Sequence, residues 1–116
     1  MHYQPVVDLH TGAVAGAEAL MRFVRADGSL ASPAEDGLID RIETDPVAVV
    51  TLMERLFECL ARDAAPLFDR VPGFYVSVNV PPSVLGTGEI SRLMTASGME
   101  PYRTRLVAEI TERQAL

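Results

Sequence analysis

Three short runs of the chain combine a β-strand pattern with polar side chains that an apolar core would exclude. They are residues 18–22 (EALMR), 77–80 (SVNV) and 109–112 (EITE). Moving an uncompensated carboxylate into an apolar strand costs on the order of several kcal/mol, so Glu18 and Glu109 each need a partner. A divalent cation is the simplest partner that oxygen donors from three strands could share. The pattern therefore predicts a metal site with Glu18, Asn79 and Glu109 as ligands.

Side chains two residues apart in a strand lie on the same face, and this groups the candidate residues further. Glu18, Leu20 and Arg22 share one face of the first run. Ser77 and Asn79 share one face of the second. The first run therefore presents a carboxylate, an apolar side chain and a guanidinium in line.

The same alternation separates the two glutamates of the third run. Glu109 shares a face with Val107 and Thr111, whereas Glu112 points to the opposite face. The two carboxylates therefore have different roles, and only Glu109 is expected among the metal ligands.

The order of the expected elements indicates an α/β fold in one domain, without a linker. These elements are a hairpin of strands 3–9 and 13–24 with its turn at 10–12, a polar loop at 25–33, helices 46–65 and 89–96, the second stopped by Gly98, and strands 74–80 and 106–111. The first helix is the best supported, because Asp45 and Pro46 have the order of an N-cap followed by a first-turn proline. Strands that alternate with helices favour parallel β/α units.

Composition and charge restrict the function classes. The chain is 48% hydrophobic and 22% charged, which is typical of a soluble globular domain. No run approaches the roughly 18 consecutive apolar residues of a membrane span, and no basic-apolar signal region opens the chain, so a cytoplasmic location is expected. A net charge of −6 argues against a nucleic-acid polymer as partner. The lone Cys59 excludes an internal disulfide and is expected to be a small buried hydrophobe.

Five motifs in order resemble the N-terminal part of an EAL domain. They are residues 3–8 (YQPVVD), 18–20 (EAL), 37–39 (GLI), 77–80 (SVNV) and 109–112 (EITE). The EAL family comprises cyclic di-GMP phosphodiesterases and inactive relatives that bind the same ligand. The resemblance implies a modified TIM barrel whose first strand runs antiparallel to the others.

The resemblance also implies an activity, the hydrolysis of cyclic di-GMP to the linear dinucleotide. Glu18, Asn79 and Glu109 would hold Mg²⁺ or Mn²⁺, with Glu18 and Glu109 counted as catalytic. The metal would lower the pKa of a bound water and orient it for in-line attack on phosphorus.

Further roles follow from the same resemblance. Arg22 would contact the dinucleotide by charge-assisted hydrogen bonds, with Gln4 and Leu20 beside it. Glu112 would steer a loop rather than touch the ion.

The chain differs from the family pattern at two places and is shorter than a complete domain. Residues 31–38 are shorter than the family's usual stretch, and Pro81-Pro82 intervenes before Ser83. A complete barrel takes roughly 250 residues, so residues 1–116 are expected to be the N-terminal half of one domain and to be inactive alone. The family's remaining metal ligands and a water-orienting lysine would come from the missing half.

Each of these residues also has an alternative role that is structural and involves no ligand. Glu18 could be an edge-strand carboxylate, Asn79 a turn residue, and Glu109 and Glu112 a solvated strand end. Three functions therefore stay open: part of an enzyme, a non-catalytic cyclic di-GMP-binding or protein-interaction module, and a fragment that self-associates through an unpaired sheet edge.

Overall fold

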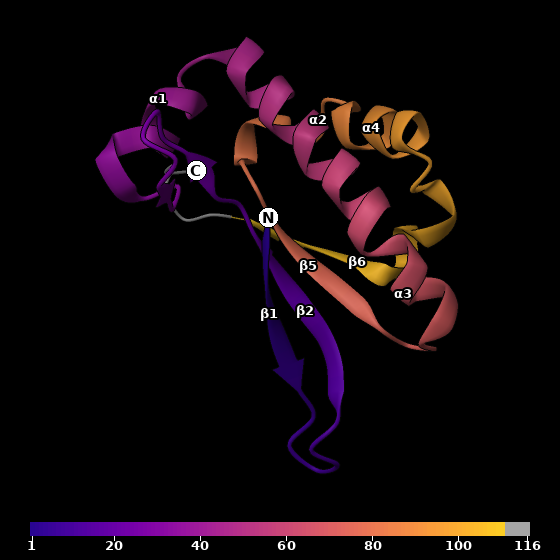
Figure 1. The fold of residues 1–116 in the computed structure, drawn as a ribbon. Helices are drawn as coiled ribbons and strands as arrows, with labels where there is room; N and C mark the ends of the chain where they lie inside the picture. Colours follow the sequence, from indigo (N-terminus) through magenta and orange to yellow (C-terminus); the bar gives the residue numbers. More distant parts are fainter. Residues whose placement is uncertain (111–116) are drawn as a thin grey trace.

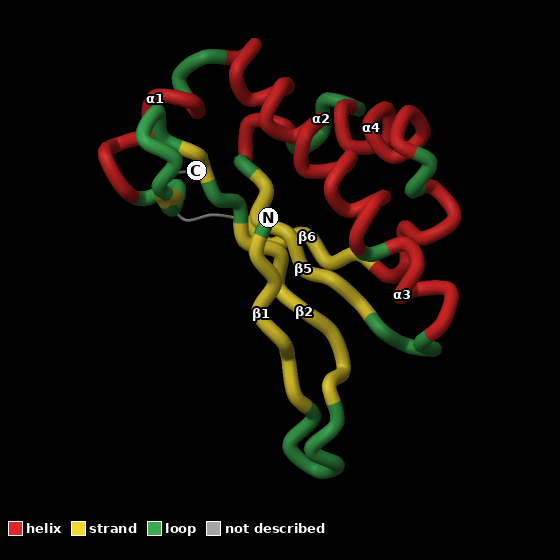
Figure 2. Tube along the Cα trace, in the orientation of Figure 1, coloured by secondary structure: helices red, strands yellow, loops and turns green. Residues whose placement is uncertain are grey.

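A computed structural model describes residues 1–110 of the 116-residue chain. The elements in chain order are β1 (His2–Val7), β2 (Val14–Leu20), β3 (Phe23–Val24), β4 (Leu30–Ala31), η1 (Glu35–Gly37), α1 (Leu38–Glu43), α2 (Pro46–Asp63), α3 (Ala65–Arg70), β5 (Tyr75–Val80), η2 (Pro82–Val84), α4 (Glu89–Ser97), η3 (Glu100–Arg105) and β6 (Leu106–Ile110). The predicted positions of Thr111 and Glu112 lie outside the described residues. Figure 2 shows β1, β2, β5 and β6 gathered into one sheet with the long helices to one side.

Four strands form the main sheet, in the order β1-β2-β5-β6. β1 is antiparallel to β2, whereas β2, β5 and β6 run parallel to one another. This arrangement confirms the predicted α/β sheet with an antiparallel first strand. The β1–β2 hairpin projects well beyond the helices in Figure 1. Within residues 1–110, β6 pairs only with β5, so self-association through this edge stays a prediction.

The predicted strand at residues 13–24 is wrong beyond Leu20. β2 ends at Leu20, and Phe23 and Val24 pair instead with Ala31 and Leu30 in a separate two-stranded sheet. A tight turn closes this hairpin, because the Gly28 N–H donates to the Arg25 carbonyl at 2.9 Å. The predicted polar loop at residues 25–33 is therefore largely a hairpin.

The helix α2 begins where the sequence predicts. Asp45 accepts hydrogen bonds from the N–H groups of Val47 and Ala48, and Pro46 opens the first turn. The predicted end at residue 65 is late, since α2 ends at Asp63 and the short α3 follows with a proline in its first turn. Proline has no N–H for the helical ladder, so a new helix starts there.

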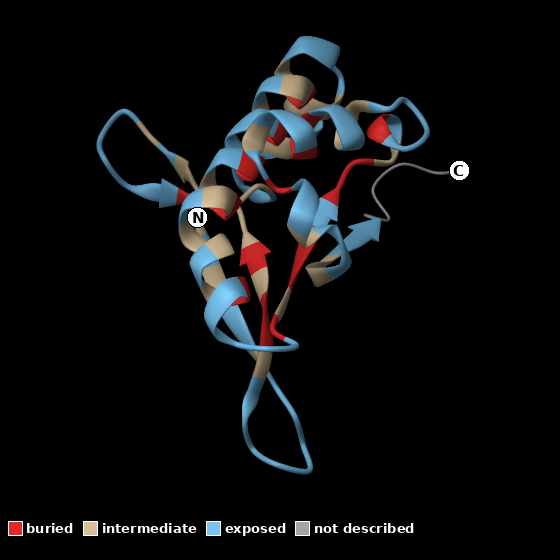
Figure 3. Ribbon diagram, turned by 90° about the vertical axis from the view of Figure 1, so that its right-hand side faces the viewer, coloured by how far each residue is buried: buried red, intermediate tan, exposed pale blue. Residues whose placement is uncertain are grey.

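One apolar core fills the space between the sheet and the helices. The strand residues of this core are Ala17, Ala19, Val76, Val78 and Val80, and its helical residues include Val49, Met53, Leu56, Phe57, Leu60, Phe68, Leu93 and Met94. Figure 3 shows the buried residues concentrated at this interface, while the tip of the β1–β2 hairpin is exposed. Cys59 is only partly buried, so the expectation of a buried thiol is met in part.

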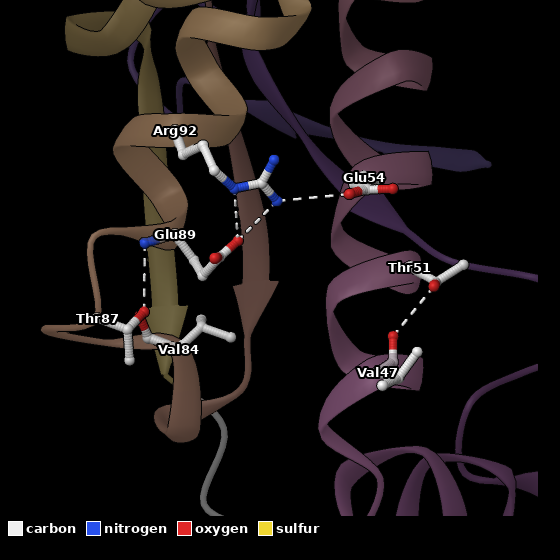
Figure 4. A network of polar contacts seen from close by, with 7 residues as sticks. All are labelled: Val47, Thr51, Glu54, Val84, Thr87, Glu89 and Arg92. Atoms are coloured by element: carbon white, nitrogen blue, oxygen red, sulfur yellow. Dashed lines mark hydrogen bonds and ion pairs between the residues drawn. The ribbon is translucent and has the colours of Figure 1, made fainter.

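Polar contacts join α4 to α2 on the outer surface. Arg92 donates to Glu89 Oε2 at 2.7 and 3.0 Å and to Glu54 Oε1 of α2 at 3.4 Å (Figure 4). α4 ends at Gly98, whose φ of 79° gives it a left-handed C-cap, as the sequence predicts. Such exposed ion pairs add little stability, so the buried faces of these helices hold them in place.

Three further elements surround the ends of the strands. Within the shortened segment 31–38, β4 ends at residue 31, η1 follows at residues 35–37, and α1 begins at residue 38. Pro81 precedes η2, which follows β5 directly. In the described part of the chain, no helix is long and apolar enough to cross a membrane.

Candidate functional site

The predicted site residues lie on the face of the sheet that points away from the helices. Gln4 is opposite Glu18 across β1 and β2, and Glu18 is opposite Ser77 of β5. Asn79, two residues further along β5, is opposite Glu109 of β6. Since residues directly opposite in a ladder point to the same side, all these side chains share one face. The alternative of Asn79 as a turn residue is wrong, because it lies within β5.

The register sets the spacing of the three predicted metal ligands. Neighbouring strands lie about 4.8 Å apart, and residues two apart in a strand are separated by about 6.6 Å. The Cα atom of Glu18 is therefore roughly 8 Å from that of Asn79 and roughly 12 Å from that of Glu109. Two extended glutamate side chains with metal–oxygen distances of about 2 Å can span the longer separation. Asn79 is on β5, the strand between β2 and β6, which carry the two glutamates.

The exposure of these residues corrects one premise of the sequence argument. Glu18 is partly exposed, and Asn79 and Glu109 are exposed, so desolvation alone does not require a cation in residues 1–110. Their side chains make no hydrogen bond or ion pair with another described residue, which leaves their oxygens available to water or a ligand. Within the described residues, no group of three or more His, Cys, Asp or Glu could hold a metal. The candidate set has only two carboxylates, and an amide must complete it.

A cavity of about 310 Å³ opens beside these strand ends. Leu20, Arg22 and Asn79 all line it, so the structure brings three of the predicted site residues together. Most of the other lining residues are apolar, and they come from the β3–β4 region, α1 and α2: Met21, Phe23, Pro33, Ala34, Ile39, Leu52 and Leu56. Glu18 precedes Leu20 by two residues in β2, and Glu109 is opposite Asn79. An apolar pocket with a few polar groups at its edge is the usual form of a small-molecule site.

Arg22 lies in the segment that links β2 to β3. One of its terminal nitrogens donates to the Met21 carbonyl at 2.7 Å, which fixes the side chain locally. A guanidinium carries five N–H groups, so further donors remain for an anion in the cavity. The continuous strand that placed Arg22 on the face of Glu18 does not form, but Arg22 still reaches the cavity.

Glu43 is a candidate residue that the sequence analysis missed. It is the last residue of α1, and it lines both this cavity and a second one of about 290 Å³ near Pro46 and Ser83. Its Oε1 is buried and has no hydrogen-bond partner among the described residues. An unsatisfied buried carboxylate oxygen is costly, and a donor on a bound ligand would relieve it. The sequence gives no signal for Glu43, because no motif marks it and its burial depends on the packing of α1.

Gln4 and Glu112 complete the predicted set. Gln4 is exposed on β1 opposite Glu18, at the edge of the sheet in the described part of the chain. Glu112 lies outside the described residues, so its role as a loop-positioning residue stays a prediction. His2 and His10 are exposed.

Comparison with known proteins decides the family. The EAL domain model matches residues 1–116. The chain belongs to the EAL domain family. The EAL chain described here is 34% identical over 119 residues to the Escherichia coli (strain K12) protein named "Probable cyclic di-GMP phosphodiesterase PdeN". It is 29% identical over 120 residues to that organism's "Probable cyclic di-GMP phosphodiesterase PdeB". The match covers 98% of this chain but only 22% of either relative.

Solved EAL structures share the fold. The EAL enzyme Bd1971 in its cAMP-bound form superposes with a TM-score of 0.74 at 22% identity, covering 96% of this chain and 32% of that one. The PaMucR phosphodiesterase in its c-di-GMP complex gives a TM-score of 0.70 at 23% identity, covering 96% of this chain and 45% of that one. Residues 1–110 therefore have the fold of part of an EAL barrel, as predicted.

Proposed function

We propose that the chain is part of a cyclic di-GMP phosphodiesterase domain, to which it contributes metal ligands and one side of the nucleotide site. The observation that carries this proposal is the register of the sheet. It groups Glu18, Asn79 and Glu109 on one face. Of these three residues, Asn79 lines the cavity, together with Leu20 and Arg22. The family relationship and the relatives named as cyclic di-GMP phosphodiesterases support the same substrate.

The donor set fits a hard divalent cation. Two carboxylates and one amide oxygen are ligands that Mg²⁺ and Mn²⁺ accept, and these ions commonly keep several water ligands. Glu18, Asn79 and Glu109 would hold the metal in this chain. When bound, such an ion lowers the pKa of a coordinated water and balances the charge of the phosphate.

The cavity residues would bind the nucleotide. Arg22 would donate to a phosphate oxygen, and Leu20 would give apolar contact to the ligand. Guanine offers N–H donors on its Watson–Crick edge, and the unpartnered Oε1 of Glu43 is an acceptor that they would satisfy. This pairing would favour guanine over adenine, because adenine lacks the N2 amino group.

Manganese titration tests the metal role. Relaxation or calorimetric titration of Mn²⁺ should show weak binding by the parent chain and at least tenfold weaker binding by Glu109→Gln. Glu58→Gln, which alters an exposed glutamate of α2, is the matched control and should bind as the parent does. Identical binding by the parent and Glu109→Gln would remove Glu109 from the site.

Nucleotide binding and turnover test the substrate. Calorimetry with cyclic di-GMP and cyclic di-AMP on the parent and on Glu43→Leu should show a loss confined to the guanine ligand, about tenfold or more. Residues 1–116 alone should not produce linear dinucleotide at the rate of a complete domain. In a complete EAL domain that contains them, production of linear dinucleotide with Mn²⁺ present, abolished by Glu18→Gln, would establish hydrolysis. Binding without turnover, in the full-length protein as well, would favour a cyclic di-GMP-binding module instead.

A further inference from the structure

Arg105 is the residue directly before β6, and its guanidinium binds three main-chain carbonyls. Its Nε donates to the Phe74 carbonyl at 2.7 Å, its Nη2 to the Val71 carbonyl at 2.7 Å and its Nη1 to the Phe68 carbonyl at 3.3 Å. The guanidinium carbon also lies 5.3 Å from the centre of the Phe68 ring. Arg105 therefore ties the start of β6 to the end of α3 and to the residue before β5 (Figure 1).

The other residues of β6 specify its register only weakly. Val107 and Ile110 are 46% and 55% exposed, and Ala108 and Glu109 are also exposed in the described part of the chain. Leu106, Ala108 and Ile110 share the face toward the helices, but only Leu106 packs against the core, and Val107 adds an apolar side chain on the other face. A strand that buries so little of its apolar face is prone to slip along its neighbour.

A slip of β6 would disrupt the candidate metal site. The observed register pairs Leu106 with Val76 and Glu109 with Asn79. A shift by one residue would turn Glu109 toward the helices, and a shift by two would move it about 6.6 Å along the sheet. The anchor at Arg105 is four residues before Glu109, so it acts on the register and not on the ligand itself.

We propose that Arg105 is a positioning residue that fixes the register of β6, so that Glu109 is opposite Asn79. The role in register stands on the contacts of Arg105 alone, whereas its consequence for metal binding rests on the proposed function. Arg105 contributes through its planar fork, because three carbonyls in fixed positions need several directed N–H groups.

Arg105→Met and Arg103→Met form a matched pair. Both remove an arginine from η3, but Arg103 is 69% exposed, and its one ion pair within residues 1–110 is with Glu100 of the same helix, at 3.1 Å. Nuclear Overhauser effects between the β5 and β6 backbones and amide hydrogen exchange report the register without metal or nucleotide. We expect Arg105→Met to lose the contacts that pair Asn79 with Glu109 and to exchange its β6 amides at least tenfold faster. Arg103→Met should match the parent.

The outcomes separate this inference from the proposed function. Native β5–β6 contacts and β6 exchange within twofold of the parent in Arg105→Met would overturn the positioning role. If Arg105→Met does not fold, Arg105→Lys is used instead, because lysine keeps the positive charge but lacks the planar guanidinium. Unchanged exchange of the β6 amides in Arg105→Lys would also overturn the proposal. Mn²⁺ binding should fall at least tenfold with the loss of register. If the register changes in Arg105→Met but the parent chain itself binds no Mn²⁺, the positioning role of Arg105 is supported and the proposed metal site is refuted.

Discussion

The hydrogen bond between Tyr3 and Asp63 anchors the antiparallel strand β1 to helix α2. The Tyr3 hydroxyl donates to Asp63 Oδ2 at 2.8 Å, and the Tyr3 ring packs against the core. Gln4, the next residue, points to the opposite face and lies across from Glu18. Loss of this hydrogen bond would therefore loosen β1, the strand that carries the candidate nucleotide-binding residue Gln4.

Replacing Tyr3 by Phe removes the hydroxyl and keeps the ring. A hydrogen bond to a charged acceptor contributes about 1.5–3 kcal/mol when buried. The Asp63 side chain is 30% exposed and also bonds Arg62, so a loss of about 1 kcal/mol is expected. With an unfolding entropy of about 2.1 cal/mol/K per residue over 116 residues, this loss lowers Tm by about 4 °C.

A double-mutant cycle measures the pair directly. Urea unfolding of the parent, Tyr3→Phe, Asp63→Asn and the double variant should give a coupling free energy of about 1 kcal/mol. Tyr75→Phe is the control, because the Tyr75 hydroxyl makes no hydrogen bond to a described residue. A coupling below about 0.3 kcal/mol would refute the anchoring role, as it falls within the additivity of independent sites.

The pair also has a defined pH dependence. The hydrogen bond from Arg62 lowers the pKa of Asp63 from its usual 3.8, burial opposes this shift, and the hydrogen bond from Tyr3 adds to it. Its stabilisation is therefore present above pH 3.8 and is lost as the pH falls through the lower pKa of the folded state. Burial, and then the hydrogen bond to Asp63, raise the pKa of Tyr3 above its usual 10.0. That stabilisation is complete below pH 10 and is lost as the pH rises through the pKa of the folded state.

Four further substitutions test other parts of the structure. Leu60→Ala, at a core position with 0% exposure, should cost about 2–5 kcal/mol in urea unfolding; a cost under about 1 kcal/mol would contradict the packing. Asp45→Ala removes the N-cap of α2 and should cost about 1 kcal/mol by thermal circular dichroism, with Asp45→Asn close to the parent. Gly98→Ala should cost about 1–2 kcal/mol, because φ at this position is 79°, and no change would argue against a left-handed cap. Arg22→Gln should weaken cyclic di-GMP binding about tenfold in calorimetry and reduce its salt dependence; unaltered affinity would exclude a phosphate contact.

The features that the sequence predicted depend on short-range chemistry. Asp45 and Pro46 start α2, and Gly98 ends α4, because an N-cap, a first-turn proline and a left-handed glycine act within one turn of the helix. The alternation in β2 and β5 correctly separated the core face from the face of Glu18 and Asn79. The family motifs added the expectation of a modified TIM barrel, where the residues alone indicated only β/α units.

Other features depend on residues far apart in the chain. No local pattern shows that β2 stops at Leu20, since the partner of Phe23 and Val24 is the segment 30–31 and not a strand of the main sheet. Glu43 is one of several acidic residues in the sequence, and only the packing of α1 against α2 gives it a buried oxygen beside a cavity. Likewise, Arg105 resembles any surface arginine until the fold brings three carbonyls to its guanidinium. Sequence therefore determined the long strands and helices, the faces of β2 and β5 and the chemical types at the strand ends. Tertiary structure decided which of those groups meet, because register, cavities and buried unpaired atoms arise only when distant segments pack together.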